Sequence, residues 1–145
     1  MEGDGSPLMA LVIDASYTIA LALQEGDISG AHEVGEQIAD RGAVVPSLWR
    51  FDVANVLLMA VRRKRISPSR PMAILADLDA LPITIDDAAT IRAWTATYAL
   101  AERHGLSVYD AAYLELALRS DAVLASLDGD LIEAARREGV TVIGG

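Results

Sequence analysis

The stretch that most constrains the fold lies between residues 107 and 130, where a helical pattern leads through a polar turn into a short apolar run. The run AVLASL ends at Asp128, and Asp110 stands near the start of the helix. A helix that returns into a strand is half of a βαβ unit, in which the helix start and the end of a neighbouring parallel strand meet at one sheet edge. The two acids therefore predict a carboxylate pocket at that edge.

The rest of the chain repeats this alternation of short apolar runs and helical segments. Asp86 and Asp87 open a helix predicted to reach about His104, and we interpret these two acids as helix caps outside any site. The alternation predicts an α/β fold of three layers with a mostly parallel central sheet. We expect one domain over residues 10–145, after a flexible N-terminal leader at 1–9. Strands are predicted at 10–13, 43–45, 81–85, 122–127 and 140–143.

Composition narrows the possible functions. The chain has no cysteine, and its two histidines, His32 and His104, are far apart, which argues against disulfides, thiolate zinc sites and a histidine-based metal site. A net charge of −9 argues against nucleic-acid binding through a broad basic surface. An enzyme that meets phosphates through bound cations stays possible. The hydrophobic content of 52% predicts that some apolar surface lies in an oligomer or partner interface.

Targeting signals do not stand out in the sequence. No apolar run reaches the 18 or so residues that a membrane helix needs. The segment MEGDGSPL lacks the basic and then apolar pattern of a signal peptide. We therefore predict a soluble cytoplasmic protein without membrane contact.

Asp14 directly follows the first predicted strand, in the sequence LVIDAS at 11–16. The carboxyl end of a parallel strand is where open α/β sheets place their chemistry. An Asp at this position can equally be the N-cap of the next helix. The stretch alone supports both interpretations, and Ser16 fits either.

Asp52 and Asn55 are the only polar residues between Phe51 and Val61 of an apolar helical segment. Because they are three residues apart, they share one helix face. A carboxylate among apolar neighbours is costly unless it is compensated. A salt bridge to a distant Arg is one solution. We favour a metal-facing acid with Asn55 as its orienting neighbour.

Four carboxylates gathered at one sheet edge, from Asp14, Asp52, Asp110 and Asp128, would repel one another. Bound divalent cations remove that conflict, and oxygen ligands without Cys or His select Mg²⁺ or Mn²⁺. Such ions activate water and hold phosphate oxygens for in-line attack. The residues thus predict hydrolysis of a phosphodiester, although Asp110 also fits the fourth place of a capping box that begins at Ser107.

Four segments in order resemble the successive motifs of PIN-domain ribonucleases, and are most similar to VapC toxins of bacterial toxin–antitoxin pairs. They are LVIDAS at 11–16, VPSLWRFDVANVL at 45–57, LSVYDAAYLELAL at 106–118 and LASLDGDL at 124–131. The resemblance covers nearly the whole chain from about residue 10. It implies an α/β/α sandwich, RNA cleavage that depends on Mg²⁺ or Mn²⁺, a homodimer, and inhibition by a cognate VapB-like antitoxin.

The resemblance also implies roles for individual residues. Asp14, Asp110 and Asp128 match metal-site acids, and Ser16 and Ser126 match their polar neighbours. Asp130 matches a possible extra ligand. Asp52 departs from the family, which usually has Glu there. A side chain shorter by about 1.5 Å predicts that Asp52 meets the ion through water.

Other classes fit less well. A haloacid-dehalogenase-type phosphatase needs a second Asp where Ser16 stands, and a receiver domain needs a Lys near the last strand. A dinucleotide-binding fold needs a G-x-G-x-x-G turn, which is missing. The alternative outside enzymes is a degenerate PIN-like domain that only binds RNA or a partner.

Overall fold

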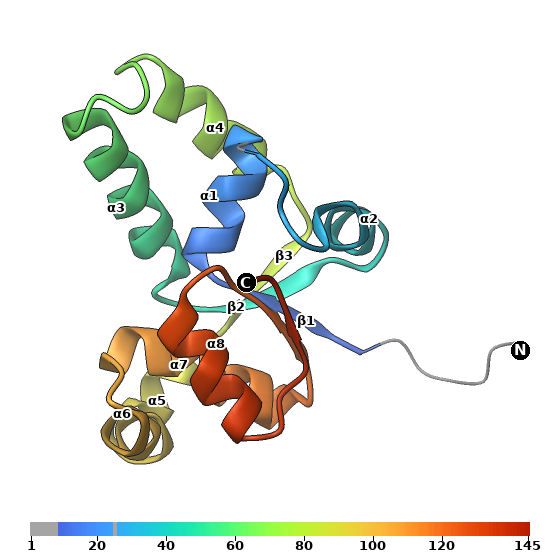
Figure 1. Ribbon diagram of the computed structural model, residues 1–145, viewed down its shortest axis with the longest axis vertical. Coiled ribbons are helices and arrows are strands. Elements are labelled where there is room, and N and C mark those ends of the chain that lie inside the picture. Colours follow the sequence, from blue (N-terminus) through green and yellow to red (C-terminus); the bar gives the residue numbers. More distant parts are fainter. Residues whose placement is uncertain (1–8, 25) are drawn as a thin grey trace, which may run out of the picture.

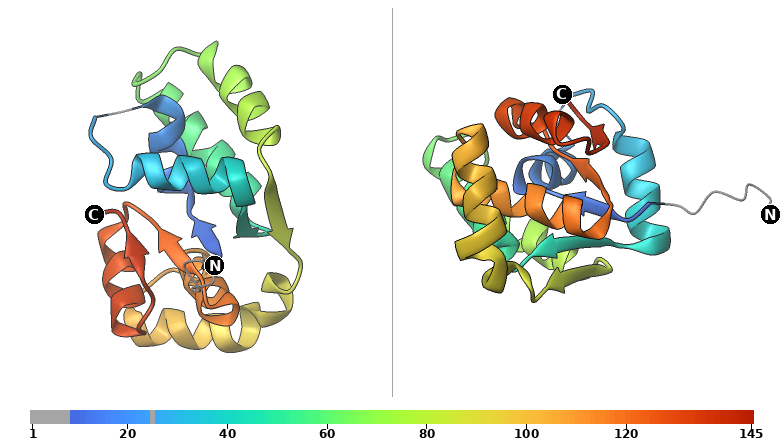
Figure 2. Two further views of the ribbon diagram at one scale, coloured as in Figure 1. Left: turned by 90° about the vertical axis from the view of Figure 1, so that its right-hand side faces the viewer. Right: turned by 90° about the horizontal axis from the view of Figure 1, so that it is seen from below.

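The computed structural model describes residues 9–24 and 26–145, so the predicted leader lies outside the described residues except for Met9. Helices cover both faces of a central sheet (Figures 1 and 2). In Figure 1, α1, α3 and α4 lie above the sheet, and α7 and α8 lie below it. This arrangement confirms the predicted three-layer α/β fold. Within the described residues, no helix is both long and apolar enough to cross a bilayer.

The sheet has five strands in the order β3-β2-β1-β4-β5, and every neighbouring pair is parallel. Each strand falls within or close to an apolar run predicted to be a strand. Leucine and β-branched residues make up most of these strands, a composition typical of parallel strands that are buried on both faces. The strands are β1 Leu11–Ile13, β2 Ala43–Pro46, β3 Ile83–Asp86, β4 Val123–Ala125 and β5 Val142–Ile143.

The helices follow the predicted segments, with one difference. The helix expected from Asp86 to about His104 begins at Ala89 and contains a π-helical segment. Core-facing residues recur in this segment every four positions. A π-helical turn holds more residues than the 3.6 of an α-helical turn, so it keeps residues at this spacing on one face of the helix. The helical elements are α1 Ala15–Leu23, α2 Ala31–Arg41, α3 Trp49–Arg62, α4 Arg70–Asp79, α5 Ala89–Arg92, the π segment η1 Ala93–Thr97, α6 Tyr98–His104, α7 Val108–Ser120 and α8 Gly129–Arg137.

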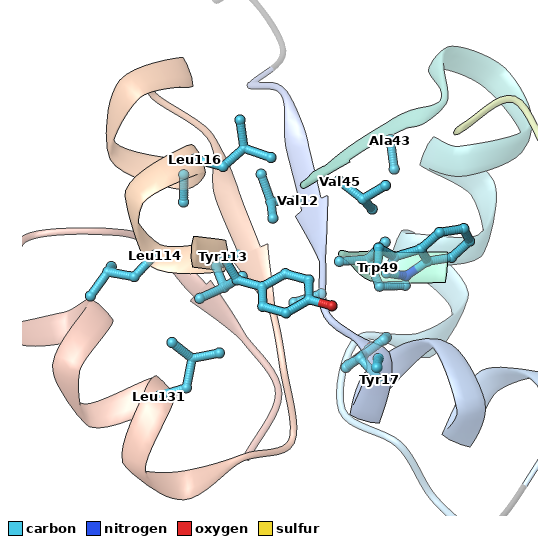
Figure 3. Packing of buried hydrophobic residues seen from close by; sticks show 14 of the residues in the cluster. Val12, Tyr17, Ala43, Val45, Trp49, Tyr113, Leu114, Leu116 and Leu131 are labelled. Atoms are coloured by element: carbon cyan, nitrogen blue, oxygen red, sulfur yellow. The ribbon is translucent and has the colours of Figure 1, made fainter. Parts of the chain in front are cut away.

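Helix α7 is the most deeply buried helix of the described chain, with every residue from 111 to 117 shielded from solvent. Its Tyr113 is 1% exposed, and Trp49 at the start of α3 is 4% exposed. Figure 3 shows the Tyr113 ring pointing from α7 toward the part of the core that holds Trp49 and Tyr17. These aromatic rings come from helices on the two sides of β1 and belong to one hydrophobic core.

A buried ion network attaches α7 to the edge of the sheet. The Arg119 guanidinium donates to both carboxylate oxygens of Asp86 at 2.7 and 3.1 Å, and to those of Glu115 at 2.8 and 2.9 Å. Hydrogen bonds from Arg119 are the main reason that the pKa of Asp86 is lowered. Asp86 also accepts from the backbone N–H groups of Ala88 and Ala89. These two groups lie at the start of α5, whose N-cap is Ala88, so Asp86 is not the N-cap that the sequence predicted, and its main role is in the ion network.

Replacing Arg119 with Leu should lower the free energy of unfolding by about 3–5 kcal/mol, because Glu115 and Asp86 would lose the cation that compensates their burial. Urea unfolding at neutral pH measures this loss. Arg50→Leu is a matched control, because Arg50 pairs with Asp79 at 2.9 Å while both side chains are more than 60% exposed. That control should lose less than about 1 kcal/mol. Equal losses in the two variants would contradict the structural role of the network.

Candidate functional site

The direction of the strand order reverses between β1 and β4. The chain moves from β1 outward to β3 on one side, and from β4 outward to β5 on the other. In open α/β sheets, ligands bind at such a switch point, outside the carboxyl ends of the strands. Ile13 and Ala125 are partners in the β1–β4 register, so the next residues, Asp14 and Ser126, lie side by side at this switch point.

The Asp14 carboxylate is buried at this point and accepts three hydrogen bonds. Its Oδ1 accepts from the Ser16 hydroxyl at 2.7 Å and from the Tyr17 backbone N–H at 2.9 Å. Its Oδ2 accepts from the Ser126 hydroxyl at 2.6 Å. Asp14 is therefore the N-cap of α1 and also lies at the sheet edge, so its capping role does not exclude a role in a site.

The serines also connect Asp14 to the loop after β4. The Ser126 hydroxyl accepts from the backbone N–H of Asp128 at 3.0 Å, and the Ser16 hydroxyl accepts from that of Leu127 at 3.1 Å. These bonds fix the start of the segment that carries Asp128. Ser16 and Ser126 thus lie beside Asp14, as the sequence predicted.

Asp52 enters the same region from the first turn of α3. Its Oδ2 accepts a hydrogen bond from the Tyr113 hydroxyl at 2.9 Å. Among the described residues, Tyr113 rather than Asn55 or an arginine is the partner of this carboxylate. Asn55 lies one turn further along α3, where it is exposed and lines the same pocket as Asp52.

Asp110 and Asp128 both lie at helix starts. Ser107 is the N-cap of α7, and its hydroxyl accepts from the Asp110 backbone N–H at 3.0 Å. Asp128 is the N-cap of α8, and its Oδ1 accepts from the backbone N–H groups of Asp130 and Leu131. Asp130 is exposed on the first turn of α8.

The four acids are close enough to affect one another electrostatically. Burial raises the pKa of Asp110, and the charges of Asp128, Asp52 and Asp14 raise it further, while a hydrogen bond with Ser107 opposes them. Burial also raises the pKa of Asp14, against hydrogen bonds from Ser126, Tyr17 and Ser16, and the charge of Asp128 adds to the rise. The sheet edge therefore brings together acids whose charges repel one another.

The donor chemistry of this cluster fits a hard divalent cation, since all of its ligating groups are carboxylate or hydroxyl oxygens. Three of the carboxylates are held by hydrogen bonds but can still accept more. Oδ2 of Asp14 accepts one hydrogen bond. Asp52 and Asp128 each accept hydrogen bonds through only one of their two oxygens. In residues 9–24 and 26–145, no three Asp, Glu or His side chains are arranged so that they could hold an ion.

An open pocket of about 500 Å³ adjoins the cluster. It lies between the first turns of α3 and α7, and both Asp52 and Asp110 line it. Two exposed aromatic rings, Phe51 and Tyr109, line the same pocket. Leu48, Asn55 and Ser107 complete its lining.

Tyr113 is the site residue that the sequence did not predict. Burial and the charge of the neighbouring Asp52 raise the pKa of its hydroxyl strongly, so it stays protonated and acts as a donor. The available signal was its position three residues after Asp110, which places both on one face of α7. Its partner, Asp52, is 61 residues away in the sequence.

Comparison with known proteins agrees with this geometry. A sequence profile described as the PIN domain matches residues 11–137. Ribonuclease VapC3 of Pyrobaculum aerophilum is 30% identical over 125 residues, which cover 86% of this chain and 94% of that protein. The chain therefore belongs to the PIN-domain family, and its sequence is similar to a VapC ribonuclease.

Solved structures share the fold. The crystal structure of PAE2754 from Pyrobaculum aerophilum aligns with a TM-score of 0.67 at 22% identity, over 94% of this chain and 92% of that one. VapBC2 from Rickettsia felis, solved bound to a DNA fragment from their promoter, aligns with a TM-score of 0.61 at 12% identity, over 92% and 97%. FitAcB from Neisseria gonorrhoeae aligns with a TM-score of 0.51 at 14% identity, over 91% and 95%.

The raised pKa values predict how stability depends on pH when no cation is bound. The folded chain keeps protons on Asp14 and Asp110 that the unfolded chain has released, so the free energy of unfolding should fall as pH rises above the ordinary carboxyl value of 3.8. Asp110→Asn removes one of these groups and should flatten the fall. Urea unfolding with a chelator, at several values between about pH 4.5 and 7.5, measures the slope.

The control for this series is Asp27→Asn, which changes an exposed acid in the connection between α1 and α2. Its slope should match that of the native chain. A slope for Asp110→Asn equal to the native slope would show that Asp110 carries no unfavourable charge in the folded state.

Proposed function

We propose that this chain is an endoribonuclease that uses Mg²⁺ or Mn²⁺ to hydrolyse RNA phosphodiester bonds, and that it is the toxin of a toxin–antitoxin pair. The observation that carries the proposal is the convergence of four carboxylates, whose charges repel one another, at the switch point of the sheet. Membership of the PIN-domain family and the similarity to Ribonuclease VapC3 support RNA as the substrate.

In this proposal Asp14, Asp110 and Asp128 would hold the cation, and Asp52 would contact it through water. A bound cation supplies a water of lowered pKa and offsets the charge of the attacked phosphate. The chain's own residues position the ligands. Ser16 and Ser126 fix the Asp14 carboxylate, and Tyr113 holds the Asp52 carboxylate by one oxygen. Asp130, exposed next to Asp128, is available as an additional ligand.

The expected protein partners are a second copy of this chain and a VapB-like antitoxin. A pocket of about 220 Å³ between α1, α2 and α4 is lined mainly by apolar side chains, including Leu21, Ile38, Ile74 and Leu78. An amphipathic segment of an antitoxin would bury these side chains. The VapBC2 structure from Rickettsia felis supports this partner class, because its shared fold is found there in a toxin–antitoxin complex. These proposed partners fit the predicted cytoplasmic location.

Asp110→Asn should abolish RNA cleavage in the presence of Mn²⁺ while leaving the fold intact. Asn keeps the shape of Asp but removes the charge that would hold the cation. Cleavage of labelled total RNA, followed on a denaturing gel, measures the activity, and circular dichroism checks the fold. Asp27→Asn should cleave at the native rate. A folded Asp110→Asn protein with native activity would remove Asp110 from the site, and an inactive native chain would favour the degenerate domain.

Substitutions can distinguish the role of Asp52 in cation binding from that of Tyr113. Asp52→Ala should weaken Mn²⁺ affinity by about tenfold to a hundredfold, the range typical of residues that act through another ligand. Asp52→Glu should be tolerated, because the longer side chain can reach the cation directly. Tyr113→Phe removes the hydroxyl that orients Asp52, so it should shift Mn²⁺ affinity in the same direction as Asp52→Ala but by less.

Calorimetric Mn²⁺ titrations of the three variants, each paired with a urea melt, test this assignment. Asp52→Ala leaves the buried Tyr113 hydroxyl unpaired, which should cost about 1–3 kcal/mol of stability. Native Mn²⁺ affinity in Asp52→Ala would leave a three-acid site and make the Asp52–Tyr113 pair purely structural.

A further inference from the structure

Two exposed aromatic residues each stand immediately before an acid of the site. Phe51 precedes Asp52 in the first turn of α3, and Tyr109 precedes Asp110 in the first turn of α7. Phe51 is 83% exposed and Tyr109 is 69% exposed. Both rings line the pocket of about 500 Å³ that also holds the two carboxylates. Aromatic side chains of this size are normally buried in a core or an interface, so the exposure of these rings indicates a binding surface.

The position of the rings favours a small planar partner over a second protein surface. A protein that covered Phe51 and Tyr109 would also bury the carboxylates of Asp52 and Asp110 in the same pocket. Burying charged groups without compensating partners is costly. A different set of exposed apolar side chains, Ile91, Trp94 and Tyr98, lies on the elements α5, η1 and α6 and does not line this pocket.

Electrostatics points to the same kind of partner. The chain carries a net charge of −9, and the pocket is lined by two acids and no basic side chain, so the pocket itself does not attract RNA phosphates through basic groups. Stacking of bases on aromatic rings is the other main source of affinity for single strands, and it does not depend on charge. Bases of a duplex are already stacked on each other and are not available for it.

We propose that Phe51 and Tyr109 form a base-stacking site for single-stranded RNA next to the carboxylate cluster, and that the Asn55 amide hydrogen-bonds a base edge there. This inference rests on the proposed ribonuclease function and names the form of RNA that the site takes. The two rings hold the nucleotides on either side of the pocket, which places the phosphate between them close to Asp52 and Asp110. Phe51 and Tyr109 are thus substrate-binding residues, separate from the groups that hold the cation.

The test combines binding and cleavage of a fluorescently labelled single-stranded RNA of about 12 nucleotides, a length that spans a typical single-strand site. Binding is measured by anisotropy with Mg²⁺ in the Asp110→Asn background, where the RNA stays intact. Cleavage is measured with Mn²⁺ in the otherwise native chain. Phe51→Ala and Tyr109→Ala should each raise the Kd and the KM by about tenfold or more, with a much smaller change in kcat.

Two further substitutions distinguish stacking from general apolar contact. Phe51→Tyr keeps a flat ring and should retain native affinity, whereas Phe51→Leu keeps apolar volume without the ring and should bind as weakly as Phe51→Ala. Met72→Ala is the control, because Met72 is 71% exposed on α4 and lies outside this pocket. It should leave binding and cleavage unchanged. A duplex RNA of the same sequence should bind the native chain more weakly than the single strand.

Several results would overturn the inference. Native Kd and KM in Phe51→Ala and Tyr109→Ala would show that the rings do not touch RNA. Loss of a native dimer in Phe51→Ala, seen by light scattering, would show that a second copy covers the ring. If the native chain binds RNA through the two rings but never cuts it, the proposed function fails and the stacking site stands.

Discussion

Parallel pairing between β1 and β4 sets Asp14 beside Ser126, and the rest of the site is arranged around that contact. The Asp14 backbone N–H donates to the carbonyl of Ala125 at 3.1 Å, which extends the strand pairing by one residue beyond β1. A shift of this register by one residue would move the side chains to the opposite faces of the sheet. The short strands therefore determine the geometry of the site, because the buried carboxylate can accept from Ser126 only in this register.

Around this contact the fold brings four carboxylates close together, where their charges repel one another. Capping roles account for the positions of Asp14 and Asp128, since each accepts hydrogen bonds at a helix start. They do not account for the convergence of four acids. Burial raises the pKa of Asp110 and of Asp14, and the charges of neighbouring acids raise both further. The ion network of Arg119 shows how this chain neutralises acids when they serve structure alone. The contrast between the two clusters supports cation binding at the sheet edge.

Much of this arrangement could be predicted from the sequence. The apolar runs predicted the strands, and the acids that follow or precede them predicted which residues meet at the carboxyl edge. Local patterns do not reveal contacts between distant segments. The Tyr113–Asp52 hydrogen bond joins residues 61 positions apart, and the Arg119 network joins α7 to Asp86, which local pattern marked only as a cap. The π segment was also missed, because a four-residue spacing of core-facing residues is hard to tell from the 3.6-residue period of an α-helix.

The central claim is that the carboxylate cluster holds a divalent cation in the folded chain, and Mn²⁺ titration followed by thermal unfolding tests it most directly. A cation that binds only the folded state raises the melting temperature in proportion to the logarithm of its concentration once the site is saturated. The account predicts such a rise for the native chain and its loss in Asp14→Asn, whose carboxylate lies at the switch point between β1 and β4. An unchanged melting temperature at millimolar Mn²⁺ in the native chain, or an equal rise in both proteins, would contradict it.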